Sequence, residues 1–166
     1  LRGARAGQTL MGDGGNDRRE GPGGDDLLDG GSGSDTLDGG AGQDHLRFDS
    51  LAQGVSVDWR TGTASSGGAV DQFTGMEILS ATGFDDSLIT SAGDDQVFAL
   101  AGNDTVDTAG GNDTLDGGAG EDWLHFSLSG GGVQASLASG TASGAGTVVL
   151  SGFEHLGGSA HDDTLT

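Results

Sequence analysis

The sequence contains no cysteine and no lysine. Without cysteine, neither disulfides nor thiolate metal sites can stabilise the chain, so any metal that helps it to fold must bind oxygen ligands. The basic residues are 6 arginines against 26 acidic residues in a chain of 166, which gives a formal net charge of -20. This charge excludes nucleic acid, anionic membrane surfaces and phosphate-rich ligands as direct partners.

The chain is also poor in apolar residues. Leucine, isoleucine, valine and phenylalanine together number 33 of 166, about 20%, a level at which a highly charged chain is expected to stay disordered. No apolar run approaches the length of a membrane span, so we expect no membrane insertion. Residues 1–12 lack the apolar segment of a signal peptide, as an internal piece of a longer protein would. Folding therefore needs another source of stability.

What the sequence has instead is a nine-residue repeat of glycine and aspartate. Rows of nine can be cut over residues 12–47 and 81–125, and every row carries aspartate in sixth place. These aspartates are Asp17, Asp26, Asp35, Asp44, Asp86, Asp95, Asp104, Asp113 and Asp122. The eighth place is leucine or valine in every row except the first, where it is Arg19. Agreement at two places of each row indicates a repeat architecture.

A longer period encloses the short one. Residues 12–89 align with residues 90–166 at an offset of 78, which falls to 77 after one deletion, so we predict two modules. The first module, residues 1–89, has repeat rows at 12–47, a spacer at 48–80 and a row at 81–89, and the second, residues 90–166, has rows at 90–125, a spacer at 126–157 and a row at 158–166. We expect the chain to be a piece of a longer repeat protein.

The residue types in a row predict its conformation. Places one to six are glycine-rich, which allows the positive φ of a sharp turn, and places seven to nine surround an apolar residue, which favours a short strand. Two such rows make one flattened coil, so each row should lie over the row two places later and the apolar residues should stack as a thin inner ladder. In the spacers, Phe48, Val57 and Phe73 predict strands that continue or cap the coil.

The spacing of stacked strands fits a calcium ion. Neighbouring strands lie about 4.7 to 4.9 Å apart, and two calcium–oxygen bonds of about 2.3 to 2.6 Å span the same distance. An ion between adjacent coils would take one sixth-place carboxylate from each coil and backbone carbonyls from the turns. Without it, the carboxylates would repel each other. Calcium is thus the predicted source of the missing stability.

Three rows carry a family resemblance. The segments GGSGSDTLD, GGAGQDHLR and GGAGEDWLH fit the GGxGxDxUx nonapeptide of the RTX (hemolysin-type calcium-binding) repeat family in full, and the other rows fit it in part. The segments GVSVDWRTGTASSGG and FTGMEILSATGFDDSLIT also resemble spacers of large RTX proteins. The resemblance covers nearly the whole chain. It implies an all-β fold, a right-handed parallel β-roll or β-helix solenoid with calcium ions between its turns.

The resemblance also implies a set of calcium ligands. The sixth-place aspartates, with Asp163 of the last row, would be side-chain ligands. The backbone carbonyl ligands would come from Gly12, Gly14, Gly21, Gly23, Gly30, Ser32, Gly39, Ala41, Ala99, Ala101, Gly110, Gly117 and Ala119. Complete sites would pair residues 17 with 35, 26 with 44, 86 with 104, 95 with 113 and 104 with 122, which makes about five ions. Gln8 takes the sixth place of a preceding row, a cap without a carboxylate.

What the family does gives a functional expectation. RTX proteins are typically exported by type I secretion through an ABC transporter, remain loose in the calcium-poor cytosol and fold outside. The resemblance therefore implies a structural calcium-binding region of a larger secreted bacterial protein, extracellular or at the cell surface, with calcium and the transporter as partners. A chain of net charge -20 that needs cations before it can collapse agrees with this expectation.

The sequence carries no recognisable catalytic motif. It has no GxSxG elbow, P-loop, HExxH or EF-hand spacing, and its histidines follow no zinc-ligand spacing. We therefore predict a region that is not itself an enzyme, whatever the activity of the parent protein. Two alternatives stay open: a polysaccharide-binding accessory module of a secreted enzyme such as an alginate epimerase, lipase or protease, and part of an adhesin or ice-binding solenoid. We expect Trp59 and Trp123 to pack the spacer against the roll, with sugar stacking as the alternative role for either.

Overall fold

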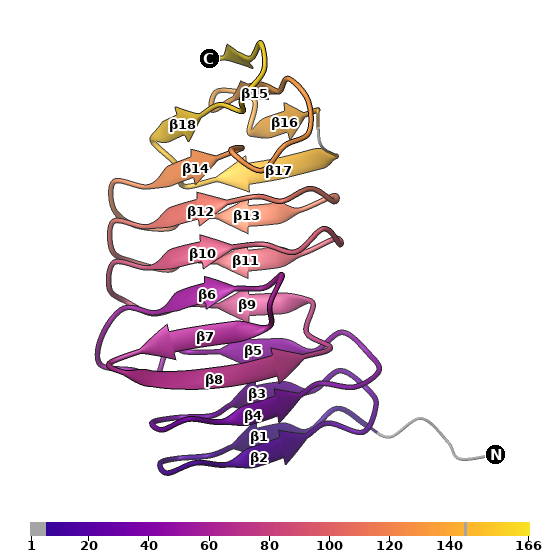
Figure 1. Cartoon of the computed structure of the whole chain (residues 1–166), viewed down its shortest axis with the longest axis vertical. Coiled ribbons are helices and arrows are strands. Elements are labelled where there is room, and N and C mark those ends of the chain that lie inside the picture. Colours follow the sequence, from indigo (N-terminus) through magenta and orange to yellow (C-terminus); the bar gives the residue numbers. More distant parts are fainter. Residues whose placement is uncertain (1–5, 145) are drawn as a thin grey trace, which may run out of the picture.

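The computed structural model describes residues 6–144 and 146–166. These residues form 19 short strands, which stack into one elongated roll (Figure 1). No described residue lies in a helix, so this part of the chain offers no helix that is long and apolar enough to cross a membrane. The predicted all-β class is confirmed.

Each repeat row supplies one three-residue strand at its seventh to ninth places. In the first array the strands are β1 (Thr9–Met11), β2 (Arg18–Glu20), β3 (Leu27–Asp29), β4 (Thr36–Asp38) and β5 (His45–Arg47). In the second array they are β10 (Ser87–Ile89), β11 (Gln96–Phe98), β12 (Thr105–Asp107), β13 (Thr114–Asp116) and β14 (Trp123–His125). The turns between them need glycine where the backbone is left-handed, as at Gly31 with φ of 78°.

The two spacers form antiparallel hairpins. The first spacer contains β6 (Ser56–Asp58), β7 (Thr63–Ser66), β8 (Ala69–Thr74) and β9 (Ile78–Ser80). The second contains β15 (Gln134–Ser136), β16 (Thr141–Ser143), β17 (Thr147–Ser151) and β18 (His155–Gly157), and β19 (Thr164–Leu165) follows. In the first, β8 lies on β4, and in the second, β17 lies on β13. Each hairpin therefore continues a repeat sheet.

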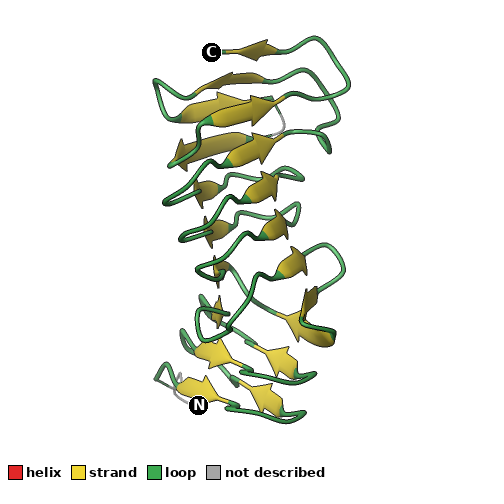
Figure 2. Ribbon diagram, turned by 90° about the vertical axis from the view of Figure 1, so that its left-hand side faces the viewer, coloured by secondary structure: helices red, strands yellow, loops and turns green. Residues whose placement is uncertain are grey.

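The strands build two sheets that face each other along the roll (Figure 2). One sheet has ten strands in the order β1-β3-β5-β9-β11-β13-β17-β16-β15-β19, and the other has nine in the order β18-β14-β12-β10-β6-β7-β8-β4-β2. Within the arrays the register is constant, with Leu28 beside Leu46 and Val106 beside Leu124. Each row thus lies over the row two places later, which confirms that prediction.

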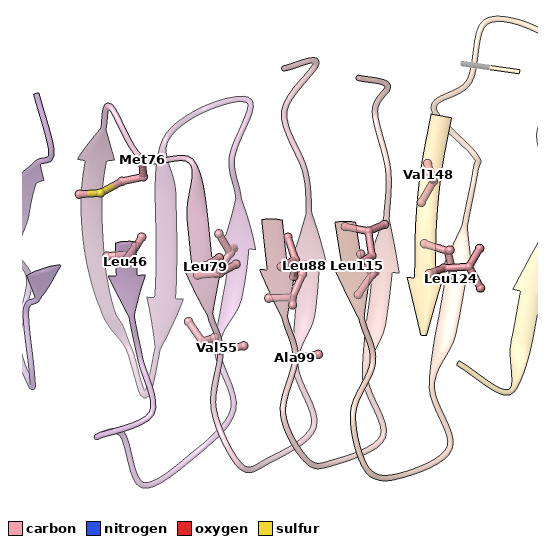
Figure 3. Close-up of a cluster of buried hydrophobic side chains, with 14 of the residues drawn as sticks. Leu46, Val55, Met76, Leu79, Leu88, Ala99, Leu115, Leu124 and Val148 are labelled. Atoms are coloured by element: carbon pink, nitrogen blue, oxygen red, sulfur yellow. The ribbon is translucent and has the colours of Figure 1, made fainter. Parts of the chain in front are cut away.

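The core is a thin file of apolar side chains between the two sheets, seen in part in Figure 3. The eighth-place residues from Leu28 to Leu124 are only 0 to 2% exposed, and Phe48 and Phe126 of the spacers are equally buried. At the first coil, Arg19 lies beside Leu37, and its guanidinium is 3.3 Å from the carboxylate of Asp17. The aliphatic stem of Arg19 can cover this end of the core while its charge stays paired.

Candidate metal centre

The sixth-place aspartates form ladders of buried carboxylates along the roll. Each lies where a turn enters a strand, and all except Asp17 are 0 to 6% exposed. Within a ladder, the backbone N–H of one aspartate donates to Oδ1 of the aspartate 18 residues later, as from Asp17 to Asp35 at 2.8 Å. The structure brings together the members of all five predicted pairs, 17–35, 26–44, 86–104, 95–113 and 104–122.

The second carboxylate oxygen sets several of these aspartates apart. Among the described residues, a buried Oδ2 atom has no hydrogen-bond partner in Asp17, Asp26, Asp35, Asp44, Asp104 and Asp122. We call these the unpartnered oxygens. A buried polar group without a partner costs about 1 to 3 kcal/mol, and more when it is charged. A cation bound at these oxygens would remove that cost.

Burial also changes the protonation of the ladder. Loss of hydration raises the pKa of Asp44 and Asp122 above the ordinary aspartate value, and it raises the pKa of Asp104 to about 7. Neighbouring carboxylates add to the rise, Asp86 and Asp122 in the case of Asp104. The ladder therefore disfavours its own negative charge, and a cation bound beside it would favour the ionised form and offset this rise in pKa.

Backbone oxygens of the next coil border the unpartnered oxygens. At Gly21, an added side chain would overlap Asp26 Oδ2, and its Cβ would lie 2.8 Å from the carbonyl oxygen of Gly39. The same arrangement recurs at Gly12. Glycine thus leaves open a space that is bounded by a carboxylate oxygen of one coil and a carbonyl oxygen of the next. These donors fit calcium, which prefers carboxylate and carbonyl oxygens.

The other predicted carbonyl ligands lie in the turns, which stack coil on coil. The carbonyl oxygens of Ser32 and Ala41 accept hydrogen bonds from the N–H groups of Gly15 and Gly24 at 2.8 and 2.9 Å. Because a carbonyl oxygen has two lone pairs, each keeps one that could bind a cation. The turns also contain Gly14, Gly23, Gly30, Ala99, Ala101, Gly110, Gly117 and Ala119. Their use as ligands stays a prediction.

Some aspartates of the second array have hydrogen-bond donors on Oδ2. The bonds run from the Thr82 N–H to Asp86, from the Ser91 N–H to Asp95 and from the Thr108 hydroxyl to Asp113, at 2.8, 2.8 and 2.7 Å. Asp163 follows this pattern, with the Ser159 N–H at 2.6 Å. Burial raises the pKa of Asp113 to about 6 despite its hydroxyl partner. In these four aspartates, hydrogen bonds from the chain itself satisfy Oδ2 atoms that the family resemblance predicted to bind calcium.

Two glutamates that the sequence analysis did not assign to a site extend the ladders into the spacers. Glu77 Oε2 accepts the N–H of Asp44 at 2.9 Å, and Glu154 Oε2 accepts the N–H of Asp122 at 2.8 Å. Each takes the place that the aspartate of a further row would take. A signal was present in the sequence, because the two glutamates align with each other between the modules.

A second ladder, formed by fifth-place side chains, also went unnoticed in the sequence. Asp85 accepts the N–H of Asn103 at 2.7 Å, and Asn103 accepts the N–H of Glu121 at 3.1 Å. Asp25 accepts the N–H of residue 43 at 2.9 Å in the same way. Fifth-place side chains therefore bind the following coil, whereas sixth-place side chains bind the preceding one. Each turn is held from both sides.

Both tryptophans and two of the four histidines are engaged in aromatic packing. Trp123 stacks on His125 and His155 with ring centroids 5.3 and 4.6 Å apart, and Trp59 meets Phe73 edge to face at 6.2 Å. Across residues 6–144 and 146–166, no three His, Asp or Glu side chains converge on one point that could hold a metal. A calcium site in this roll would therefore depend on paired carboxylates and backbone carbonyls.

Comparison with known proteins identifies the repeat. The sequence model of the RTX calcium-binding nonapeptide repeat (4 copies) matches residues 11–46, 72–106 and 99–128, more than half of the chain. No curated relative matches. The crystal structure of the extracellular lipase LipA from Serratia marcescens is similar at 18% sequence identity and a TM-score of 0.40, over 90% of this chain and 37% of the lipase chain. The chain thus spans little more than a third of that lipase. By its repeated nonapeptides and its match to the sequence model of the repeat, the chain belongs to the RTX calcium-binding nonapeptide repeat family.

Proposed function

We propose that this chain is a structural, calcium-folded section of a larger secreted protein, in which calcium ions join successive coils of the roll. The observation that carries the proposal is the ladder of unpartnered oxygens, which are buried and have no hydrogen-bond partner in the described part of the chain. Membership of a calcium-binding repeat family supports calcium as the cation. Bound calcium would supply the partner that these oxygens lack and would neutralise the negative charge of the carboxylates.

The predicted sites differ in their support. In the pairs 17–35, 26–44 and 104–122, Oδ2 of both aspartates is unpartnered among the described residues. We propose these three as the tighter calcium sites. In the pair 86–104 one Oδ2 accepts a hydrogen bond from the chain, and in the pair 95–113 both do. Calcium would have to displace those donors, so we propose weaker binding there.

Calcium dependence would link folding to export. The core is a single thin file, and the net charge of -20 opposes collapse until cations arrive. Extracellular calcium modules commonly bind in the range of about 10⁻⁴ to 10⁻³ M, so such a section would stay unfolded in a calcium-poor cytosol and fold outside. Passage through a type I secretion ABC transporter is the export route that family membership supports. Once folded, this section would have a structural, stabilising role in the parent protein.

A calcium titration of the metal-free chain tests the proposal, with far-UV circular dichroism as readout and magnesium as control. We expect a cooperative gain of β signal with calcium alone, reversed by a chelator. Asp26→Asn replaces an unpartnered oxygen and should raise the midpoint calcium concentration. Asp49→Asn changes an exposed carboxylate that pairs with Arg47 and should leave the midpoint unchanged. Complete β structure without metal would overturn the proposal.

A further inference from the structure

Asp71 lies in the first spacer, yet it occupies the position of a repeat aspartate. It follows Asp35 by 36 residues, which is four nine-residue periods. In this frame, residues 66–74 read SGGAVDQFT, with Asp71 in sixth place and Phe73 in eighth place. Strand β8 pairs with β4 so that Phe73 lies beside Leu37. The first hairpin therefore contains a divergent repeat row, stacked on the last row of its own sheet.

The contacts of Asp71 are those of a ladder member. Its Oδ1 atom accepts the N–H of Asp35 at 2.8 Å, the same bond that joins the predicted pairs. Asp71 is 7% exposed and Asp35 is 2% exposed. Asp35 Oδ2 is one of the unpartnered oxygens, with no donor from the residues that the structure describes. Two buried carboxylates thus lie close together, Asp35 directly before β4 and Asp71 within β8, and Asp35 has an oxygen without a partner among the described residues.

A hollow separates the turns that precede these two aspartates. A cavity of about 470 Å³ lies between the turn at 31–33 and the hairpin turn around Ser66 and Gly67, and Asp71 lines it. The lining combines apolar side chains, such as Leu51, with the Asp71 carboxylate, two serine hydroxyls and the carbonyl groups of glycine-rich turns. A divalent cation would take its oxygen ligands at the Asp71 end of this cavity, next to Asp35, which does not itself line it.

The second module provides an internal comparison. Asp113 corresponds there to Asp35, Thr108 to Gly30 and Val148 to Asp71. The Thr108 hydroxyl donates to Asp113 Oδ2 at 2.7 Å, and the N–H of Asp113 donates to the carbonyl of Thr147 at 3.1 Å. Where the spacer lacks a carboxylate, the carboxylate below it is satisfied by a hydroxyl. Where the spacer has Asp71, Oδ2 of Asp35 meets no donor from the described residues and is free to bind a cation. Asp35 would then serve two pairs, 17–35 and 35–71, as Asp104 serves the pairs 86–104 and 104–122.

We infer that Asp35 and Asp71 bind a calcium ion that fastens the first spacer hairpin to the first array, and that the second module has no such ion. This inference rests on the proposed function. It adds a site outside the recognised nonapeptides, which makes the two spacers unequal: the first hairpin is metal-dependent, and the second is held by hydrogen bonds and apolar contacts alone.

Calcium stoichiometry, measured by equilibrium dialysis with metal analysis, tests the inference. Asp71→Asn should bind one ion fewer per chain than the wild type, and Asp49→Asn, with the same change of charge at an exposed position of the same spacer, should bind as many as the wild type. In saturating calcium, the amides of residues 66–74 should exchange faster in the Asp71→Asn variant, while those of β10 to β13 stay unchanged.

The double variant Thr108→Gly with Val148→Asp gives a test that does not depend on the stability of the Asp71→Asn variant. It removes the hydroxyl partner of Asp113 and supplies the missing carboxylate, so it should gain one ion per chain. A wild type that binds no calcium would contradict the proposed function itself. A wild type that binds calcium, with no loss in Asp71→Asn or no gain in the double variant, would overturn only the site at Asp35 and Asp71.

Discussion

Gly30 in the first array and Thr108 in the second occupy the same place of corresponding rows, and the carboxylate beside each has a different partner. Beside Gly30, Asp35 Oδ2 meets no donor from the described residues, whereas beside Thr108, Asp113 Oδ2 accepts a hydroxyl bond of 2.7 Å. Four of the six unpartnered oxygens belong to the first array. The second array satisfies more of its ladder from within the chain.

The difference teaches that a hydroxyl group and a cation are alternative partners for the same oxygen. A hydrogen bond to a charged group contributes about 1.5 to 3 kcal/mol and is present whenever the chain is folded. Stabilisation by a bound ion grows with the ion's concentration relative to its dissociation constant. The first array should therefore depend on calcium more steeply than the second, although both have the same fold and register.

Removal of calcium should separate the arrays most strongly. As free calcium is lowered, we expect the amides of β3 to β5 to lose protection before those of β10 to β13. The first array has two more unpartnered oxygens than the second, and each costs about 1 to 3 kcal/mol. At intermediate calcium, amides of the first array should therefore exchange at least about tenfold faster than those of the second. Hydrogen exchange followed by mass spectrometry at graded calcium concentrations measures this. Equal loss of protection in both arrays would show that they unfold as one unit, and the comparison would then have no thermodynamic consequence.

Acidification of the metal-free protein should stabilise it, chiefly through the second array. Burial raises the pKa of Asp104 to about 7 and that of Asp113 to about 6, above their unfolded value of 3.8. The folded state thus binds more protons than the unfolded state between these values. This stabilisation is complete below about pH 4 and is lost as the pH rises through 6 to 7, at about 1.4 kcal/mol per unit of pKa shift.

Far-UV circular dichroism of the metal-free chain at pH 5 and pH 8 checks this expectation, and the fraction of β structure should be higher at pH 5. Asp104→Asn should flatten the dependence, because the amide does not titrate in this range. With calcium present the trend should reverse, since calcium binds the deprotonated carboxylates. A metal-free protein that is more stable at pH 8 would contradict the raised pKa values.

The smallest effect is expected at the outer face, where the arrays differ in aromatic content. Trp123 of β14 corresponds to His45 of β5, and Trp123 is 41% exposed although it stacks on two histidines. Trp123→His should make the second array resemble the first at this place. Because aromatic pairs contribute about 0.5 to 1.5 kcal/mol, the thermal midpoint in calcium should fall only slightly. A change in the number of bound ions would contradict a purely packing role.

Much of the roll could be predicted because every row repeats the same environment. Aspartate in sixth place and an apolar residue in eighth place indicated the strands, the two-row coil and the inner file, and the paired aspartates do lie together. The partners of Oδ2 could not be predicted in this way. They depend on single residues such as Ser91 and Thr108, whose hydroxyl and amide groups reach the carboxylate only in the folded turn.

The spacers were predicted less well than the rows. Their apolar residues indicated strands, but antiparallel pairing within β6 to β8 follows from turns that the nine-residue frame does not describe. Asp71 was missed although it stands in frame, because its row has a valine in fifth place and lies inside a hairpin. Reading the frame through the spacer would have found it.

The two hairpins belong to opposite sheets. The first hairpin, β6 to β8, is part of the nine-stranded sheet, and the second, β15 to β17, is part of the ten-stranded sheet. Each hairpin stacks on the row before the last of its array, and successive rows alternate between the sheets. The five rows from β10 to β14 separate the spacers, so the second hairpin lies on the other side from the first. An even number of rows would put both on one side. Whether a row count is odd or even therefore decides which side of the rod displays each spacer, and the loss of a single row would reverse every spacer after it.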